Sequence, residues 1–98
     1  MIASFGDPAT EDLYHGIRSS RVRRFPSTIL PVALRKLDYL NAAASLNDLR
    51  SPPGNHLEAL RGSWKGFHSI RINDQWRIIF RWSDAQAYDV QVIDYHRG

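Results

Sequence analysis

The chain has 98 residues, a formal net charge of +3 and no cysteine. This length allows one domain, residues 1–98, and leaves no room for a second core. Without cysteine, neither disulfides nor thiolate metal sites can form. No apolar stretch approaches the roughly 20 residues of a membrane span, and no secretory signal opens the chain. We therefore expect a cytoplasmic protein that does not contact membranes.

The positive charge comes almost entirely from arginine, which supplies all but Lys36 and Lys65 of the 13 basic residues. The planar guanidinium suits phosphate binding and stacking. Codon usage in a GC-rich genome also enriches arginine. The composition permits a polyanionic partner but does not require one.

The first half of the chain predicts a short strand and then a helix. The apolar start, residues 1–5, is typical of a strand. Asp7 and Pro8 fit an N-cap followed by proline at the first helical position. We expect this helix to reach about Gly16, with Leu13 on its apolar face.

A second and longer helix follows the basic segment 18–24. Ser27 or Thr28 can cap it, and Pro31 falls in its first turn. Apolar residues at helical spacing then form one stripe. The stripe contains Leu30, Ala33, Leu34, Leu37, Leu40 and Ala44. We expect this face to pack in the core.

The second half of the chain has the pattern of antiparallel strands. Residues 51–56, "SPPGNH", form a loop because they combine helix and strand breakers. Alternating apolar and polar residues then recur in three runs, over residues 67–72, 76–82 and 88–93. Short polar loops join them, which is typical of a meander. The predicted class is α+β, with the two helices on the apolar face of the sheet.

The alternation also predicts the register of the strands, since opposed residues share a face. The first hairpin then has a three-residue loop, Asn73–Gln75. The pairs expected on the apolar face are Ile72 with Trp76, Ile70 with Ile78, His68 with Phe80, Phe80 with Val90 and Ile78 with Val92.

On the other face, this register sets Arg71 opposite Arg77 and Arg81 opposite Asp89. The Arg81–Asp89 pair is electrically neutral, whereas the Arg71–Arg77 pair has no carboxylate in register. Two like charges directly opposed are destabilising. They can splay into water, or they can form a phosphate-sized site, and the pattern alone favours neither.

The residue types restrict the chemistry that the chain can perform. None of the four histidines has a metal-ligand spacing, so we expect no metal and no cofactor. His68 lies on the apolar face and is expected to be partly buried with its hydrogen bonds satisfied. His96 follows the last strand, beside Asp94 and Tyr95. Such groups suit RNA cleavage through the 2′-OH, which needs a base, a cation and an acid. A small basic binding module is the competing interpretation.

Three segments together resemble the host-inhibition-of-growth (HigB) toxins of the RelE/ParE superfamily. They are the "LEALRG" segment, the "SIRINDQWRIIF" hairpin and the terminal "DYH", in that order over about residues 50–96. The resemblance implies a small antiparallel sheet with two N-terminal helices packed on one face.

The same resemblance implies the toxin of a type II toxin–antitoxin module, of the kind that serves plasmid maintenance. Such a toxin is an endoribonuclease, or mRNA interferase, that cuts mRNA on the ribosome and inhibits translation. A HigA-like helix-turn-helix antitoxin neutralises it, and operator DNA is reached only through this antitoxin.

By the resemblance, Asp94, Tyr95 and His96 match the terminal catalytic triplet of the family, and Arg77 matches a phosphate-stabilising arginine. Some members have a histidine where this chain has Glu58. Glu58 can replace it as the base, or it can be a surface residue.

Further cations are implied as RNA-binding residues. Arg61 matches a basic position that faces RNA in the family. The full set expected to contact RNA is Arg61, Lys65, Arg71 and Arg81. His56, two positions before Glu58, is the other candidate for the upstream catalytic histidine.

Two other functions are compatible with this fold. A ParE-like toxin inhibits DNA gyrase without cutting RNA, although the terminal Asp-Tyr-His argues against it. A degenerate toxin would act only as an antitoxin-binding corepressor. This function stays an alternative because Glu58 stands where some members of the family have a histidine.

Overall fold

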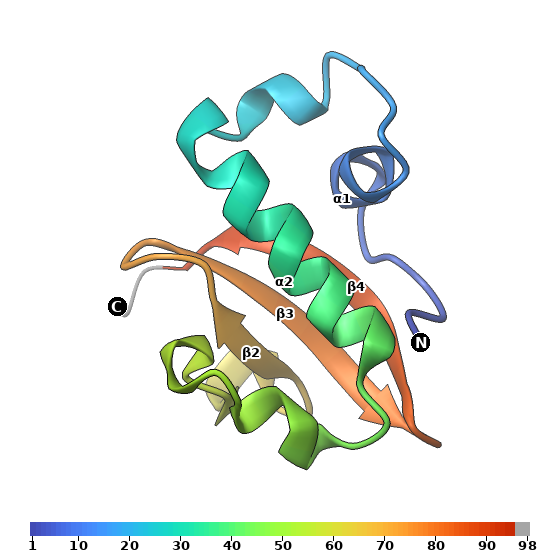
Figure 1. Cartoon of the computed structure of the whole chain (residues 1–98), viewed down its shortest axis with the longest axis vertical. Coiled ribbons are helices and arrows are strands. Elements are labelled where there is room, and N and C mark those ends of the chain that lie inside the picture. Colours follow the sequence, from blue (N-terminus) through green and yellow to red (C-terminus); the bar gives the residue numbers. More distant parts are fainter. Residues whose placement is uncertain (96–98) are drawn as a thin grey trace.

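Two helices cover one face of a four-stranded antiparallel sheet in the computed structural model, which describes residues 1–95 (Figure 1). The helices are α1 (Pro8–Tyr14) and α2 (Leu30–Ala42), and the strands are β1 (Glu58–Ala59), β2 (His68–Arg71), β3 (Trp76–Ser83) and β4 (Gln86–Asp94). The strands lie in the order β1-β2-β3-β4. The α+β class is confirmed. No helix within residues 1–95 is both long and apolar enough to cross a membrane.

Helix α1 begins as its sequence predicts. The Asp7 carboxylate accepts a hydrogen bond from the backbone N–H of Thr10 at 2.7 Å, and Pro8 occupies the first helical position. Thr10 is itself completely buried, and its hydroxyl accepts the backbone N–H of Val92 at 2.9 Å. One side chain therefore fastens α1 to β4.

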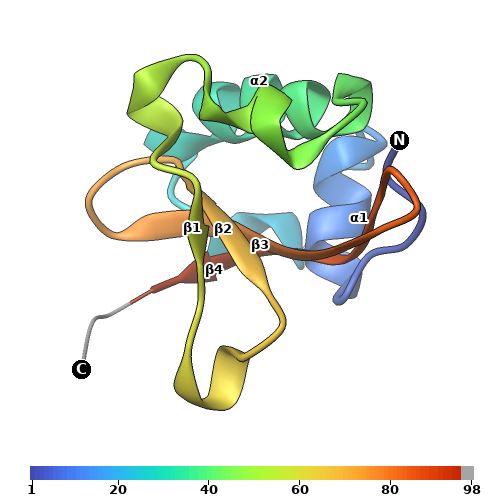
Figure 2. The same ribbon diagram turned by 90° about the horizontal axis from the view of Figure 1, so that it is seen from below.

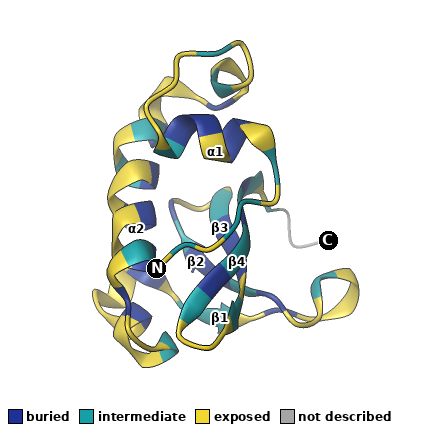
Figure 3. Cartoon of the chain, turned by 90° about the vertical axis from the view of Figure 1, so that its right-hand side faces the viewer, coloured by how far each residue is buried: buried dark blue, intermediate teal, exposed yellow. Residues whose placement is uncertain are grey.

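Helix α2 lacks the predicted side-chain cap. A 3-10 turn, Ser27–Ile29, precedes it, and neither Ser27 nor Thr28 caps the helix. The backbone N–H of Leu30 bonds to the carbonyl of Ser27, so the turn satisfies an amide that a cap would otherwise serve. The core stripe is confirmed in part, since Ala33, Leu37 and Leu40 are fully buried, whereas Leu34 is 37% exposed and Ala44 is exposed beyond the helix end at Ala42. The buried side of α2 faces the sheet (Figure 3).

The predicted N-terminal strand is wrong. Residues 1–5 run beside β4 and make two isolated parallel bridges, Ile2 with Ala87 and Phe5 with Val90. The chain then turns away at Asp7 to begin α1, so no continuous ladder develops. The segment still covers part of the β4 edge, which is a common way to protect an edge strand.

The predicted register between β2 and β3 is confirmed. His68 pairs with Phe80, Ile70 with Ile78 and Arg71 with Arg77. A short strand that the pattern did not predict, β1, pairs Glu58 with Ser69 and extends the sheet beyond β2. The expected meander therefore has a fourth strand.

Strands β3 and β4 contain a bulge that the alternation did not reveal. Ile78 pairs with Val92 as predicted, but the register shifts between Ile79 and Arg81, and Arg81 lies opposite Tyr88 instead of Asp89. Asp89 has a φ of +53°, a left-handed conformation that aspartate tolerates better than most residues. The regular register predicted for this end of the hairpin is wrong.

The outer face of the sheet carries a second, smaller apolar cluster. Leu60, Phe67 and Ile79 are its buried members, and Trp64, Ile93 and Tyr95 pack against them. Residues 60–67 form a turn on the side of the sheet away from α2 (Figure 2). Strand β3 is therefore apolar on both faces near its middle, although only one apolar face was expected.

Replacing Thr10 with valine should destabilise the fold by about 1–3 kcal/mol, because the buried N–H of Val92 would lose its acceptor. The free energy of unfolding from urea titration measures this. The matched control is Thr28→Val, since Thr28 is exposed in the 3-10 turn and its replacement should change stability by less than about 0.5 kcal/mol. Equal effects of the two substitutions would contradict the role of the Thr10 hydroxyl.

Candidate active site

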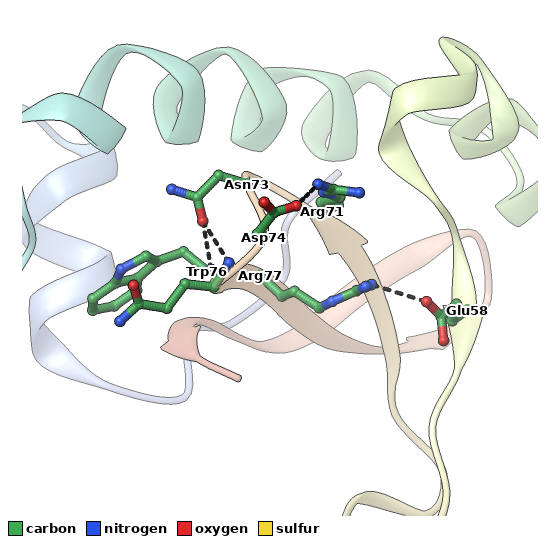
Figure 4. A network of polar contacts seen from close by, with 7 residues as sticks. Glu58, Arg71, Asn73, Asp74, Trp76 and Arg77 are labelled. Atoms are coloured by element: carbon green, nitrogen blue, oxygen red, sulfur yellow. Dashed lines mark hydrogen bonds and ion pairs between the residues drawn. The ribbon is translucent and has the colours of Figure 1, made fainter. Parts of the chain in front are cut away.

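Arg77 is the centre of a polar network on the outer face of the sheet (Figure 4). Its Nη1 atom lies 3.2 Å from Oε1 of Glu58 and donates a hydrogen bond to Oγ of Ser69 at 3.1 Å. The Arg77 side chain is only 11% exposed. Charge-assisted bonds in such a sheltered place hold a guanidinium more firmly than surface pairs do.

The strand pairing explains why Glu58 reaches Arg77. Glu58 on β1 lies opposite Ser69 on β2, and Ser69 lies opposite Ile79 on β3, so all three share the outer face. Arg77 is two residues before Ile79 and shares that face too. His56 is exposed and in a left-handed conformation at the end of the 51–56 loop. Of the two upstream candidates, Glu58 is the one that contacts the network.

Tyr95 completes the network from the end of β4. The Arg77 guanidinium carbon lies 5.7 Å from the centroid of the Tyr95 ring, within the range of a cation–π contact. The backbone N–H of Tyr95 donates to the carbonyl of Gln75 at 2.8 Å. The Gln75 side-chain amide in turn donates to Oδ2 of Asp94 at 2.9 Å. Two bonds from the hairpin loop therefore fix the first two residues of the predicted triplet.

The hairpin loop that holds this triplet is itself well ordered by local bonds. Oδ1 of Asn73 accepts the backbone N–H groups of Gln75 at 2.8 Å and Trp76 at 2.7 Å. Such Asx turns pre-form a loop without help from distant residues. The third member of the triplet, His96, lies outside the described residues, and its predicted role stays a prediction.

The two opposed arginines do not form the shared phosphate site that their register suggested. Arg71 pairs with Asp74 in the hairpin loop, while Arg77 pairs with Glu58 (Figure 4). The prediction that no carboxylate lies in register with this pair is confirmed, and Asp74 and Glu58 reach the two arginines from out-of-register positions. The like-charge repulsion is relieved by the separate partners.

The remaining predicted RNA-binding residues occupy different parts of the outer face. Arg81 lies with its guanidinium carbon 4.4 Å from the centroid of the Phe67 ring, and its Nε atom is 3.3 Å from Oδ2 of Asp89. Lys65 is exposed beside the 3-10 turn Gly62–Trp64. Arg61 lines a groove of about 550 Å³ together with Asp94 and Tyr95. Arg61 is therefore the one that approaches the triplet.

His68 does not belong to this site. It points to the helix side, where its ring stacks on Phe80 with centroids 5.9 Å apart. Burial lowers the pKa of His68 below its ordinary value, so the neutral ring is favoured. The expectation of satisfied hydrogen bonds is wrong, because within residues 1–95 no partner bonds to its buried Nδ1 atom.

The site has the groups for acid–base chemistry on a phosphate ester. Glu58 supplies a carboxylate, Arg77 a fixed cation and Tyr95 an aromatic ring, all within one cluster. Within residues 1–95, no group of three or more His, Asp or Glu side chains is placed to hold a metal ion.

The fold defines the class of protein. It matches a chain of the YoeB–YefM toxin–antitoxin complex from Staphylococcus aureus with a TM-score of 0.59, 18% identity and 98% coverage of both chains. It also matches YafQ from E. coli strain BL21(DE3) with a TM-score of 0.53, 16% identity and coverage of 94% of this chain and 91% of that one. The chain therefore shares its fold with these two solved proteins.

The sequence then gives the family. Residues 4–96 match the family described as the RelE-like toxin of type II toxin–antitoxin system HigB. The chain is 42% identical over 97 residues to Toxin HigB-1 of Vibrio cholerae, with 99% of each chain covered. The chain belongs to the HigB-like toxin family, as the motifs at its C-terminal half predict.

Several residues of the site could not be found from the motifs. Ser69 and Gln75 are ordinary polar residues whose importance appears only when their partners are known. A weak signal existed for Ser69, since it is a small polar residue between the apolar positions of a strand. No signal in the sequence pointed to Gln75, because it bonds to Asp94 and Tyr95, which lie 19 and 20 positions further along the chain.

The pKa of His68 makes stability depend on pH. Because the pKa is lower in the folded chain than its ordinary 6.5, the unfolded chain binds the proton more strongly. The free energy of unfolding should therefore fall as the pH drops below about 6.5. His68→Gln should flatten this part of the profile. Denaturant titrations between pH 5 and 8 measure the effect, and parallel profiles for the parent chain and the variant would contradict it.

Proposed function

We propose that this toxin is an endoribonuclease that cleaves mRNA on the ribosome and so inhibits translation. The observation that carries the proposal is the Glu58–Arg77–Tyr95 cluster, in which a sheltered guanidinium contacts both a carboxylate and an aromatic ring. Family membership supports the same activity. The reaction requires the cytoplasm, where translating ribosomes are found.

The cleavage uses the internal nucleophile of RNA. A base removes the proton of a 2′-OH, and the 2′ oxygen attacks the adjacent phosphorus. The bond from phosphorus to the 5′ oxygen breaks, an acid protonates that oxygen, and a 2′,3′-cyclic phosphate remains. Arg77 stabilises the negative charge that builds up on the phosphorane oxygens. No metal takes part in this sequence.

Glu58 and His96 are the two candidates for the base. Glu58 has the geometry in its favour, since its carboxylate lies beside the guanidinium that would hold the phosphate. His96 is the candidate that the family resemblance gives, and histidine is the most frequent general acid or base in enzymes. We propose that one of these two side chains removes the proton of the 2′-OH and that the other protonates the 5′ oxygen.

The other residues of the outer face hold the RNA in this proposal. Tyr95 stacks on a base, as aromatic side chains do with unpaired RNA. Asp94 orients His96. Arg61, Lys65, Arg71 and Arg81 supply positive charge for neighbouring phosphates. Arg71 and Arg81 contribute less than Arg61, because carboxylates already pair with both.

The partner that restrains this activity is an antitoxin. The solved S. aureus complex joins a toxin of the same fold to its antitoxin. We propose that a HigA-like helix-turn-helix protein neutralises this chain and carries it to the operator.

Arg77→Ala should lower the cleavage rate of ribosome-bound mRNA by about 10²–10³-fold, the usual effect of removing one transition-state contact. Mapping of 5′ ends in a reconstituted translation reaction gives both the rate and the cut sites. Arg35→Ala is the matched control, an exposed arginine on α2. Growth arrest by the parent chain with intact mRNA would reject the proposal and indicate a protein target such as gyrase.

Glu58→Gln separates the two candidate bases. The amide keeps the size and a hydrogen bond to Arg77 but cannot take a proton at neutral pH. If Glu58 is the base, the rate should fall by about 10²-fold or more. If Glu58 only positions Arg77, the loss should be about tenfold or less, and His96→Ala should cause the larger loss. Thermal melting of each variant checks that it remains folded.

A further inference from the structure

The geometry points to a nucleobase site in the groove beside Arg77, in which Gln91 selects the base next to the scissile phosphate. This inference rests on the proposed function and adds a source of sequence preference to it. The groove has a volume of about 550 Å³ and is lined by Arg61, Gly62, Ser63, Trp64, Gln91, Ile93, Asp94 and Tyr95. Its size lies within the range of about 300–1,000 Å³ usual for small-molecule sites.

Apolar and aromatic side chains give the groove the surface that a base needs. Trp64 and Tyr95 line it from two segments that are far apart in the sequence, and Ile93 on β4 lines it as well. All three side chains pack against the buried apolar cluster of the outer face, and this packing holds them in position. Aromatic side chains held in this way are the usual stacking partners of unpaired bases.

Two neutral polar groups in the groove can read a base edge. Gln91 carries both a donor and an acceptor on one amide, the combination that pairs with the edge of a base. The hydroxyl of Ser63 can act as a hydrogen-bond donor or as an acceptor. Among residues 1–95, no hydrogen bond engages either side chain, in contrast to Gln75 and Gln86, whose amides each bond to a neighbour.

The charges around the groove favour a base inside it and phosphates at its ends. Asp94 lines the groove and would repel a phosphate there. Arg61 also lines it, and Arg77 contacts the Tyr95 ring at 5.7 Å. A nucleotide stacked on Tyr95 would therefore have its phosphate beside Arg77, which is the position of the bond that breaks.

Gly6 keeps the Gln91 side chain in place. A Cβ atom at Gly6 would lie 2.5 Å from both Cγ and Nε2 of Gln91, closer than atoms can pack. The Gln91 side chain thus lies directly against the backbone of the N-terminal segment. Gly6→Ala would force the amide to move without changing any residue that lines the groove.

The first experiment measures binding separately from cleavage. The four nucleoside 3′-monophosphates are titrated into the full chain, and the indole N–H of Trp64 and the side-chain amide of Gln91 are followed by NMR. We expect both signals to move and one base to bind at least about fivefold more tightly than another, the factor that one neutral hydrogen bond provides.

Three variants then test the assignment. Gln91→Leu should reduce the preference among the four nucleotides to less than about twofold while the protein remains folded, and Gly6→Ala should weaken the preference in the same direction. Gln86→Leu is the matched control, because it makes the same change at the other end of β4, outside the groove. It should retain the preference of the parent chain.

The same variants are compared in the 5′-end mapping of cleaved mRNA. Gln91→Leu should alter which base is found beside the cut, whereas Gln86→Leu should leave the cut sites of the parent chain. The inference is overturned if Gln91→Leu keeps the nucleotide preference and the cut sites of the parent, or if the Trp64 signal does not respond to any nucleotide. The proposed function fails separately, if the parent chain cuts no mRNA.

Discussion

The pairing of β3 with both of its neighbours is the constraint on which the rest of the structure depends. Ile78 and Phe80 are completely buried on the helix side, and Ile79 is completely buried on the outer side. A slip of one residue would place Arg77 in the helix-side core and Ile78 in the active site, at a cost of several kcal/mol for the buried charge. The register is therefore fixed by burial on two faces, and the position of Arg77 follows from it.

The outer apolar cluster determines how Arg77 can act. Leu60, Phe67 and Ile79 are buried on that face, and Tyr95, which packs at the border of this cluster, contacts Arg77. Arg77 lies on this border with 11% of its side chain exposed. A cation in such a place loses part of its hydration and interacts more strongly with a bound phosphate than a fully exposed arginine would. The cluster thus serves stability and chemistry together.

The sequence predicts the fold through its periodic segments and misses what depends on single backbone conformations. The alternation at residues 68–80 and the three-residue loop were enough to obtain the β2–β3 register, since Ile70 and Ile78 must share the buried face. The bulge at Asp89 and the two-residue strand β1 leave no periodic signal, because each involves too few residues. The family motifs indicated Glu58 and Arg77, but their contact at 3.2 Å depends on β1 lying beside β2, which no local pattern shows.

The Glu58–Arg77 ion pair has a consequence for the order of events during cleavage. In the chain without RNA, the carboxylate neutralises the guanidinium and keeps it in one position, so little freedom is lost when substrate binds. A phosphate that approaches Arg77 competes with Glu58 for the same donors. The Glu58 carboxylate then accepts a hydrogen bond from the nearest donor on the RNA. In the proposed geometry this donor is the 2′-OH. If Glu58 is the base of the proposed cleavage, the substrate itself would thereby bring it into contact with the proton that it must remove.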